Sequence, residues 1–303
     1  MAWHGRKWCA DAGRHVTCST SRIMTDVVVA SPRPPQSRPR RSFYKSVLRA
    51  LTQHEVPCLV GGTFALEAHT GIRRATKDLD LFIRRDDWHR AAGALSLSGI
   101  QAALTFPHWL GKALSGRHSA DLLFCSGNGL CPVDDSWFAP ALPIRVSGVP
   151  AQLCPAEELI WSKSFVQERE RFDGADVLHL IRARADSLDW DRLLYRFGPN
   201  WEVLLSHLVL FGFVFPADRH RVPDEVMRQL LSRMSVPPPP PPIPLCRGTL
   251  LSREQYLVDV EQGGDIDARF APYGPLDSDD LVEWTAQIPM SRRAILTRHA
   301  RGT

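Results

Sequence analysis

The amino-acid sequence predicts an α+β fold, in which a small mixed sheet with flanking helices is followed by a helical region. Two observations carry this prediction. Short, apolar, β-prone runs alternate with helical patterns up to about residue 150, whereas helical patterns dominate from Pro155 onward. The chain has 303 residues, of which 44% are hydrophobic, so it can bury a core in one large domain or two small ones.

Changes in composition divide the chain into five segments. We expect a disordered leader at 1–41, which is rich in Arg, Pro and Ser, and an α+β core at 42–150. A helical domain at 151–235 precedes a proline-rich linker at 236–247, whose six consecutive prolines cannot form a helix. The linker is a stiff spacer or a docking site for a proline-recognising module. The tail at 248–303 is expected to be partly ordered.

The periodicity of apolar residues places the individual elements. Segments with helical spacing and start or stop signals lie at about 42–55, from Phe64 to the stop at Gly71, at 87–97, from Pro155 onward, and at 173–184, 189–196, 201–214, 223–234 and 278–287. Asp86 or Asp87 can cap the third of these helices, and Gly71 fits the end of the second. Short apolar runs predict strands at 58–60, 78–83, 100–106 and 120–125.

Charge and cysteine content limit the class of protein. The net charge is +4, which tolerates a polyanionic partner without requiring one. The seven cysteines include no CxxC pair, so we expect a reduced, cytoplasmic protein. No apolar run approaches the ~20 residues of a membrane span. The sequence has no P-loop, no GxSxG and no HExxH motif.

Two carboxylates lie two residues apart in a predicted strand, at Asp78 and Asp80. Side chains at this spacing point to the same face, while Leu79 points to the other face and can enter the core. Paired carboxylates repel one another unless a cation lies between them, and their oxygens suit Mg²⁺. The pair is therefore a candidate metal site, although many such pairs are simply solvated.

Two further features of the sequence support a functional role for this pair of carboxylates. Gly61-Gly62-Thr63 follows an apolar strand and opens a helix, where free N–H groups and a close backbone can receive a phosphate; a plain tight turn is the alternative. Asp121 lies inside the apolar run 120–125, where an acid is costly without a partner. It either faces water on an edge strand or faces Asp78 and Asp80 from a neighbouring strand.

Together these motifs resemble the nucleotidyltransferase superfamily of the DNA-polymerase-β-like kind. The similarity is to the bacterial branch of minimal nucleotidyltransferases and abortive-infection-type toxins, over roughly residues 42–185. It rests on the Gly-Gly-Thr turn, on Arg73–Asp80 and on Ala120–Gly129. Thr63 stands where the superfamily usually has Ser, which keeps the hydroxyl.

The resemblance implies an enzyme that moves a nucleoside monophosphate from a nucleoside triphosphate to an acceptor hydroxyl. It implies Mg²⁺ or Mn²⁺ as cofactor, with Asp78, Asp80 and Asp121 as the catalytic metal ligands. The acceptor can be a protein, a tRNA or a small molecule. The alternative is a catalytically silent nucleotide-binding or regulatory protein of the same fold, such as one half of a toxin–antitoxin pair with an antitoxin as its partner. A weaker reading is a scaffold recruited through the proline run.

The resemblance also implies the groups that bind the nucleotide. Its phosphates lie at the turn formed by Gly61, Gly62 and Thr63. Lys163 matches the Lys of a helical Lys-then-Asp segment in the family and can neutralise triphosphate charge, or it is a solvated surface lysine. Lys77 next to the metal strand can attract the triphosphate, or it belongs to a solvated basic loop.

Overall fold

A mixed, eight-stranded sheet forms the centre of the molecule. The computed structural model describes residues 28–29, 38–76, 78–236 and 239–288. The strand order is β1-β7-β8-β2-β3-β6-β5-β4. In that order the strands are β1 (Val28–Val29), β7 (Leu142–Val146), β8 (Val149–Leu153), β2 (Leu59–Val60), β3 (Asp80–Phe82), β6 (His118–Leu123), β5 (Leu110–Ser115) and β4 (Gln101–Phe106).

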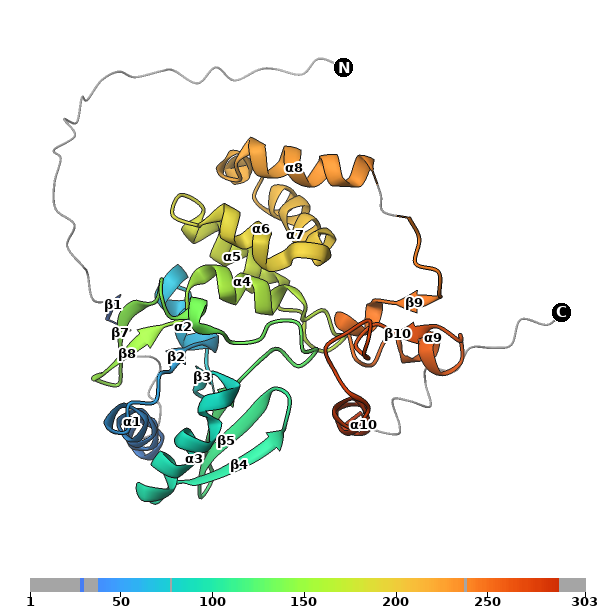
Figure 1. The fold of residues 1–303 in the computed structure, drawn as a ribbon. Coiled ribbons are helices and arrows are strands. Elements are labelled where there is room, and N and C mark those ends of the chain that lie inside the picture. Colours follow the sequence, from blue (N-terminus) through green and yellow to red (C-terminus); the bar gives the residue numbers. More distant parts are fainter. Residues whose placement is uncertain (1–27, 30–37, 77, 237–238, 289–303) are drawn as a thin grey trace, which may run out of the picture.

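Helices flank this sheet and then continue as a layer of their own (Figure 1). Helix α1 packs against α3, β6 and β8, whereas α2 packs against β3 and α5. Beyond the sheet, α4 packs against α5 and α6, α7 packs against the same two helices, and α8 packs against α7. The helices are α1 (Arg38–Gln53), α2 (Gly62–Thr70), α3 (Trp88–Leu97), α4 (Ala156–Ser164), α5 (Gly174–Arg184), α6 (Trp190–Phe197), α7 (Trp201–Val214) and α8 (Asp224–Ser235). The expected α+β class with a following helical region is confirmed.

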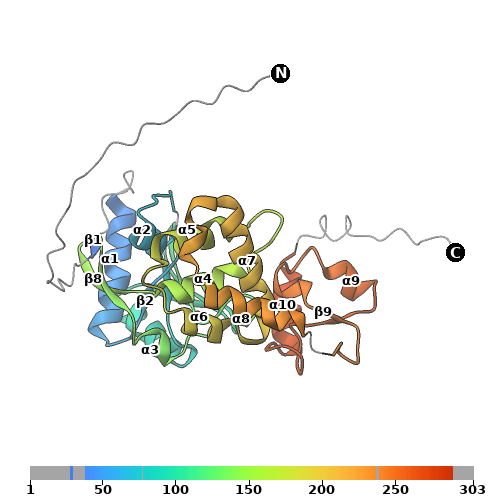
Figure 2. The same cartoon turned by 90° about the horizontal axis from the view of Figure 1, so that it is seen from above.

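The last described part of the chain, which we call the C-terminal segment, comprises residues 245–288. It contains β9 (Leu245–Cys246), α9 (Leu257–Glu261), β10 (Ile266–Asp267) and α10 (Ser278–Ala286), and β9 pairs with β10 in parallel. Figures 1 and 2 both place this segment at the end of the molecule opposite α1. The buried ion pair between Arg269 and Asp267, with a shortest N–O distance of 2.7 Å, belongs to it.

Several boundaries differ from the expectation. Helix α1 begins at Arg38, four residues before the expected start, because Pro39 falls in the first turn, where its missing N–H costs no hydrogen bond. Strand β1 also lies within the stretch 1–41 that we expected to be disordered. Asp87 does not cap α3; its carboxylate accepts hydrogen bonds from Arg84 at 2.6 Å and Arg90 at 2.8 Å instead. Strand β9 lies inside the expected linker.

Strands β5, β7 and β8 were missed, so the sheet is larger than the small one we expected. Two of them, β7 and β8, form a hairpin through Ser147 and Gly148, which have φ of 52° and 86°. Positive φ at both central residues matches the right-handed twist of a hairpin. Prolines 143 and 150 concealed these strands in the sequence, because proline normally marks a break.

One segment passes the test for a membrane span by length and composition alone: Trp190–Val214, which comprises α6, a short turn and α7. A single such segment is weak evidence, because core helices of soluble proteins pass the same test. Leu204, Leu208 and Phe211 of α7 are buried in the hydrophobic core. The expected absence of a membrane span stays a prediction.

A buried ionic cluster fastens the helical layer to the loop before β7. Glu158 on α4 is completely buried and accepts hydrogen bonds from Arg192 at 2.5 Å and Arg196 at 3.1 Å, both on α6. Arg196 also pairs with Asp134 at 2.9 Å, and Arg192 donates to the Ser136 carbonyl at 2.7 Å. Removing only one partner from such a buried ionic cluster is costly, because the charge that remains loses its counter-charge.

We predict that Glu158→Gln lowers the free energy of unfolding by about 3 kcal/mol, because Arg192 and Arg196 lose the buried carboxylate charge that they share. Urea denaturation followed by circular dichroism measures the change. The matched control is Glu225→Gln, whose carboxylate pairs with Arg228 on an exposed surface; it should change stability by about 0–1 kcal/mol. Equal effects of the two substitutions would contradict the assigned role of the buried cluster.

Candidate functional site

Asp80 and Asp121 lie side by side on neighbouring strands. Strands β3 and β6 are parallel, and their register pairs Asp80 directly with Asp121. In-register residues on adjacent strands, about 4.8 Å apart, project from the same face of a sheet. The structure therefore brings together two of the three predicted carboxylates, as we expected for an acid on a strand next to Asp80.

Asp78 is the third predicted ligand and has a different position. It lies just before β3, and its carboxylate accepts a hydrogen bond of 2.8 Å from the Ser119 hydroxyl. Its charge raises the pKa of both Asp80 and Asp121, which places it near them. It does not line the cavity described below, however. Within the described ranges, no set of three or more His, Cys, Asp or Glu side chains is arranged to hold a metal ion.

Burial and neighbouring charge perturb the two paired carboxylates. Burial and the charges of Asp121 and Asp78 together raise the pKa of Asp80 to about 6, although the charges of Lys163 and Arg171 oppose this rise. No described group donates a hydrogen bond to the Asp80 carboxylate. The pKa of Asp121 is also raised by burial, although the Lys112 ammonium, 2.6 Å from its Oδ1, partly opposes this. Neighbouring cations thus balance the negative charge of the two carboxylates only in part.

The glycine turn lies against the Asp80 carboxylate. A Cβ atom at Gly62 would lie 1.6 Å from Asp80 Oδ2, and its φ of +52° is one that side-chain-bearing residues rarely adopt. Gly61 donates its N–H to the Asp80 carbonyl at 2.9 Å, and a Cβ there would clash with the Phe82 ring. Gly62 begins α2 and lines the cavity, whereas Gly61 and Thr63 do not line it.

Of the two lysines predicted to bind the nucleotide, the structure places one in the cavity. Lys163 lies in the last turn of α4 and lines the cavity, but its ammonium already pairs with Asp173 at 2.8 Å and Asp176 at 2.9 Å. Arg74 also pairs with Asp176. Lys163 is therefore not a free surface lysine, and it shares its charge with two acids. Lys77, the other predicted lysine, lies outside the described residues.

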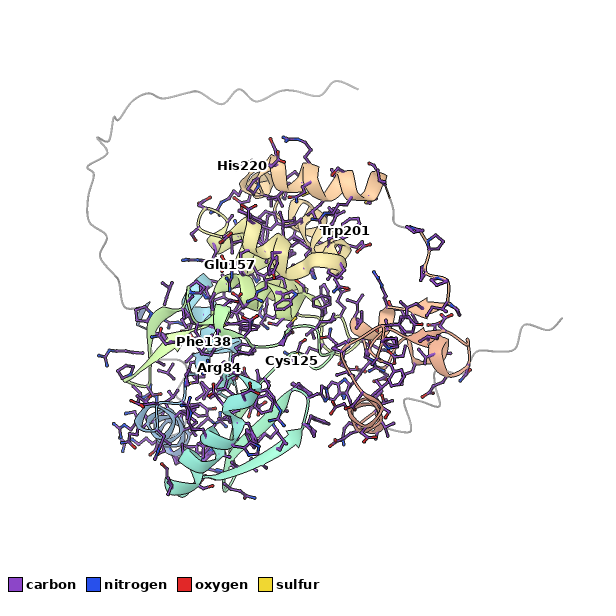
Figure 3. The ribbon with its side chains drawn as sticks, in the orientation of Figure 1. Arg84, Cys125, Phe138, Glu157, Trp201 and His220 are labelled. Carbon is purple, nitrogen blue, oxygen red and sulfur yellow. The ribbon has the colours of Figure 1, made fainter. Side chains whose placement is uncertain are left out.

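A cavity of about 330 Å³ opens at this pair of carboxylates. It lies where the sheet, α4 and the C-terminal segment meet, near Cys125 in Figure 3. Among the described residues that line it, four side chains are acidic and three are basic: Asp80, Asp121, Glu168 and Asp173 against Lys163, Arg171 and Arg253. All three basic side chains pair with acids. The cavity by itself does not favour a polyanion.

Sequence reasoning missed several residues of this site. Lys112 was hidden in the unrecognised strand β5, where its register pairs it with Asp121. Arg171 was noted in a motif but given no role, although its charge reaches Asp80. Trp109, Arg253 and Trp284 line the cavity from loops and from a segment that we expected to be only a tail. No periodic signal links these positions, which meet only through the tertiary fold.

Comparison with known proteins gives a limited result. No protein-family model and no curated protein sequence matches the chain. Solved structures with some likeness include the antibiotic-resistance factor ANT(2'')-Ia, with 16% identity over 57% of this chain and 98% of that chain and a TM-score of 0.38. An antigenic nucleotidyltransferase-like protein from Paracoccidioides brasiliensis has 17% identity over 57% and 94% of the two chains, with a TM-score of 0.34.

A putative nucleotidyltransferase from H. pylori has 15% identity over 87% of this chain and 100% of that chain, with a TM-score of 0.32. The similar structures include nucleotidyltransferases. At such identities and TM-scores these likenesses carry no weight for the activity, which must be argued from the site itself.

We predict that Gly62→Ala abolishes binding of nucleoside triphosphate, because the new methyl group displaces the Asp80 carboxylate and strains the turn. Calorimetric titration with a non-hydrolysable triphosphate measures the loss. Gly71→Ala is the matched control, since Gly71 has a φ of +73° but no neighbour within 4 Å of an added Cβ. Should both variants lose binding equally, strain alone would explain the effect and the role of Gly62 beside Asp80 would be rejected.

Proposed function

We propose that this chain transfers a nucleoside monophosphate from a nucleoside triphosphate to an acceptor hydroxyl. The observation that carries the proposal is the in-register pair of Asp80 and Asp121 beside the Gly62 turn, at the open end of a cavity. The resemblance of the sequence motifs to nucleotidyltransferases supports the same reaction. The acceptor can be a protein, a tRNA or a small molecule.

The residues present fit a divalent cation, Mg²⁺ or Mn²⁺. Asp80 and Asp121 offer only oxygen atoms, the ligands that hard cations prefer, and the Asp80 carboxylate has no hydrogen-bond donor among the described residues. A cavity lined by four acids and three bases repels a triphosphate unless further positive charge enters with it. Asp80 and Asp121 would hold the cation, with Asp78 as the third ligand once it releases Ser119.

When bound, the cation neutralises triphosphate charge and lowers the pKa of an acceptor hydroxyl. Residues of the chain bind the phosphates, stabilise the leaving group and accept the proton. Helix α2 begins at Gly62, which lines the cavity beside Asp80, and the positive end of the helix dipole there can attract a phosphate. Lys163 and Arg171 face the charge that develops on the leaving pyrophosphate. Asp121 accepts the proton of the acceptor hydroxyl.

The reaction balances as a single displacement. A bond forms between the acceptor oxygen and the α-phosphorus, and the bond from that phosphorus to the bridging oxygen of the β-phosphate breaks. Pyrophosphate leaves with the electron pair of the broken bond, and the proton of the hydroxyl passes to the Asp121 carboxylate. No oxidant or further reactant is required.

One observation favours the second candidate, a nucleotide-binding protein without turnover. The Lys112 ammonium lies 2.6 Å from Asp121, and the Ser119 hydroxyl lies 2.8 Å from Asp78. These contacts occupy two of the three carboxylates that the reaction needs. A regulatory protein that binds triphosphate through Gly62 and Asp80 alone would keep such contacts in every state.

We predict that incubation with each radiolabelled nucleoside triphosphate and Mg²⁺ labels an acceptor, or the chain itself, and that Asp80→Asn and Asp121→Asn each lower the labelling at least 100-fold. The reason is the loss of the charge that holds the cation and of the proton acceptor. Mass spectrometry identifies the labelled species.

The matched control is Asp191→Asn, an exposed acid in the first turn of α6, which should label as the native chain does. EDTA should remove the labelling and Mn²⁺ should restore it. Tight triphosphate binding without transfer to any tested acceptor would support the silent binding protein instead.

A further inference from the structure

Resting on the proposed function, we propose that Trp109, Trp284 and Arg253 form the subsite that receives the planar base of the nucleoside triphosphate. All three line the same cavity as Asp80, Asp121 and Gly62. Two of the three come from the C-terminal segment. This segment therefore belongs to the substrate site.

The aromatic side chains form one contiguous cluster. Trp284 on α10 meets Trp109 edge-on, with centroids 5.0 Å apart, and meets Phe106 in the same way at 4.9 Å. Phe106 and Trp109 are themselves stacked at 5.6 Å with only 14° between their planes. Trp109 and Trp284 keep part of their surface exposed while lining the cavity. Partly exposed indoles at a cavity wall are surfaces on which a flat ring can stack.

Arg253 adds a planar cation to this wall. Its guanidinium lies over the Trp284 ring, 4.2 Å from the centroid. An arginine stacked on tryptophan offers a flat surface on the cavity wall against which a base can lie. Glu168 pairs with Arg253 at 3.7 Å and so fixes the position of the guanidinium.

One polar group in the cluster has no partner. The Trp109 indole N–H is buried, and no group within the described ranges accepts a hydrogen bond from it. A buried donor without an acceptor is unfavourable, so an incoming ligand that carries an acceptor gains by meeting it once the indole turns this N–H toward the cavity. Nucleobases carry ring nitrogens and carbonyl oxygens of this kind at their edges.

Specific contacts seat the C-terminal segment on the core. The Asn128 amide donates to the Leu250 carbonyl at 2.7 Å, and the Gln167 backbone N–H donates to the Leu251 carbonyl at 3.1 Å. Gly127 leaves room for Trp284, because a Cβ there would come within 2.9 Å of its ring. The segment is thus built into the cavity wall, and its contacts join it to the loop after β6 and to the chain after α4.

The proline run explains how the segment reaches this place. After α8 the chain must return from the far side of the helical layer to the cavity (Figure 1). Consecutive prolines favour the polyproline II conformation, which resists bending and advances about 3.1 Å per residue. A stiff connection restricts where the segment can dock, which favours its position at the cavity.

The test compares ligands with and without a base. Calorimetric titration in Mg²⁺ uses the α,β-methylene analogues of ATP, GTP, CTP and UTP together with inorganic tripolyphosphate. We expect at least one analogue to bind about tenfold or more tightly than tripolyphosphate, since stacking of one base on an aromatic side chain contributes on this scale. Trp284→Leu should remove that difference and leave tripolyphosphate affinity unchanged, whereas Trp284→Phe should keep most of it.

Controls separate this inference from the proposed function. Val282→Ala, an exposed position on the same helix, should bind every ligand as the native chain does. If Trp284→Leu does not fold, Arg253→Gln gives the same comparison and should weaken the analogue but not tripolyphosphate. Equal weakening of both ligands, or native affinity for the analogue in Trp284→Leu or Arg253→Gln, overturns the base subsite. Failure of all triphosphates and tripolyphosphate to bind the native chain overturns the proposed function itself.

Discussion

The pairing of β3 with β6 is the constraint on which the site depends. It sets Asp80 against Asp121 in the same register, so two negative groups project together from a sheet whose other face is core. Leu79 and Leu81, which alternate with the acids, are completely buried on that other face. The apolar burial of the leucines thus holds the acids together against their mutual repulsion. A shift of one residue in this register would separate the acids and expose the leucines.

The remaining parts of the site are arranged around this pair. The Gly62 turn closes over Asp80 from one side, and α4 brings Lys163 from another. Lys112 balances the charge of Asp121, and Asp173 and Asp176 balance the charge of Lys163. Such internal partners satisfy the charged groups of a polar cavity.

Much of the fold could be predicted from the sequence, because long amphipathic helices and capped turns have strong local signals. Helices α5 to α8 lie within one or two residues of their predicted ranges, and Gly71 ends α2 with a φ of 73° as expected. Strands β5, β7 and β8 could not be predicted. Their residues include lysine and prolines, and their pairing depends on distant parts of the chain.

The candidate site likewise contains residues that could be predicted from the sequence and residues that could not. The position of Asp121 on a strand next to Asp80 is one of the two alternatives that the sequence left open, the other being an edge strand facing water. The partners of the acids, Lys112 for Asp121 and Ser119 for Asp78, are set by strand register and cannot be found from local sequence. The C-terminal contribution through Trp284 and Arg253 depends on how a segment folds back after the proline run, which no local pattern reports.

The most direct test of the central claim is a crystal structure with Mn²⁺ and a non-hydrolysable nucleoside triphosphate, in which anomalous scattering locates the metal. The account predicts a manganese peak within about 2.0–2.3 Å of carboxylate oxygens of both Asp80 and Asp121, with a phosphate bound beside Gly62. A peak elsewhere, or an intact pair between Lys112 and Asp121 with the nucleotide bound and no metal between the two acids, would contradict it.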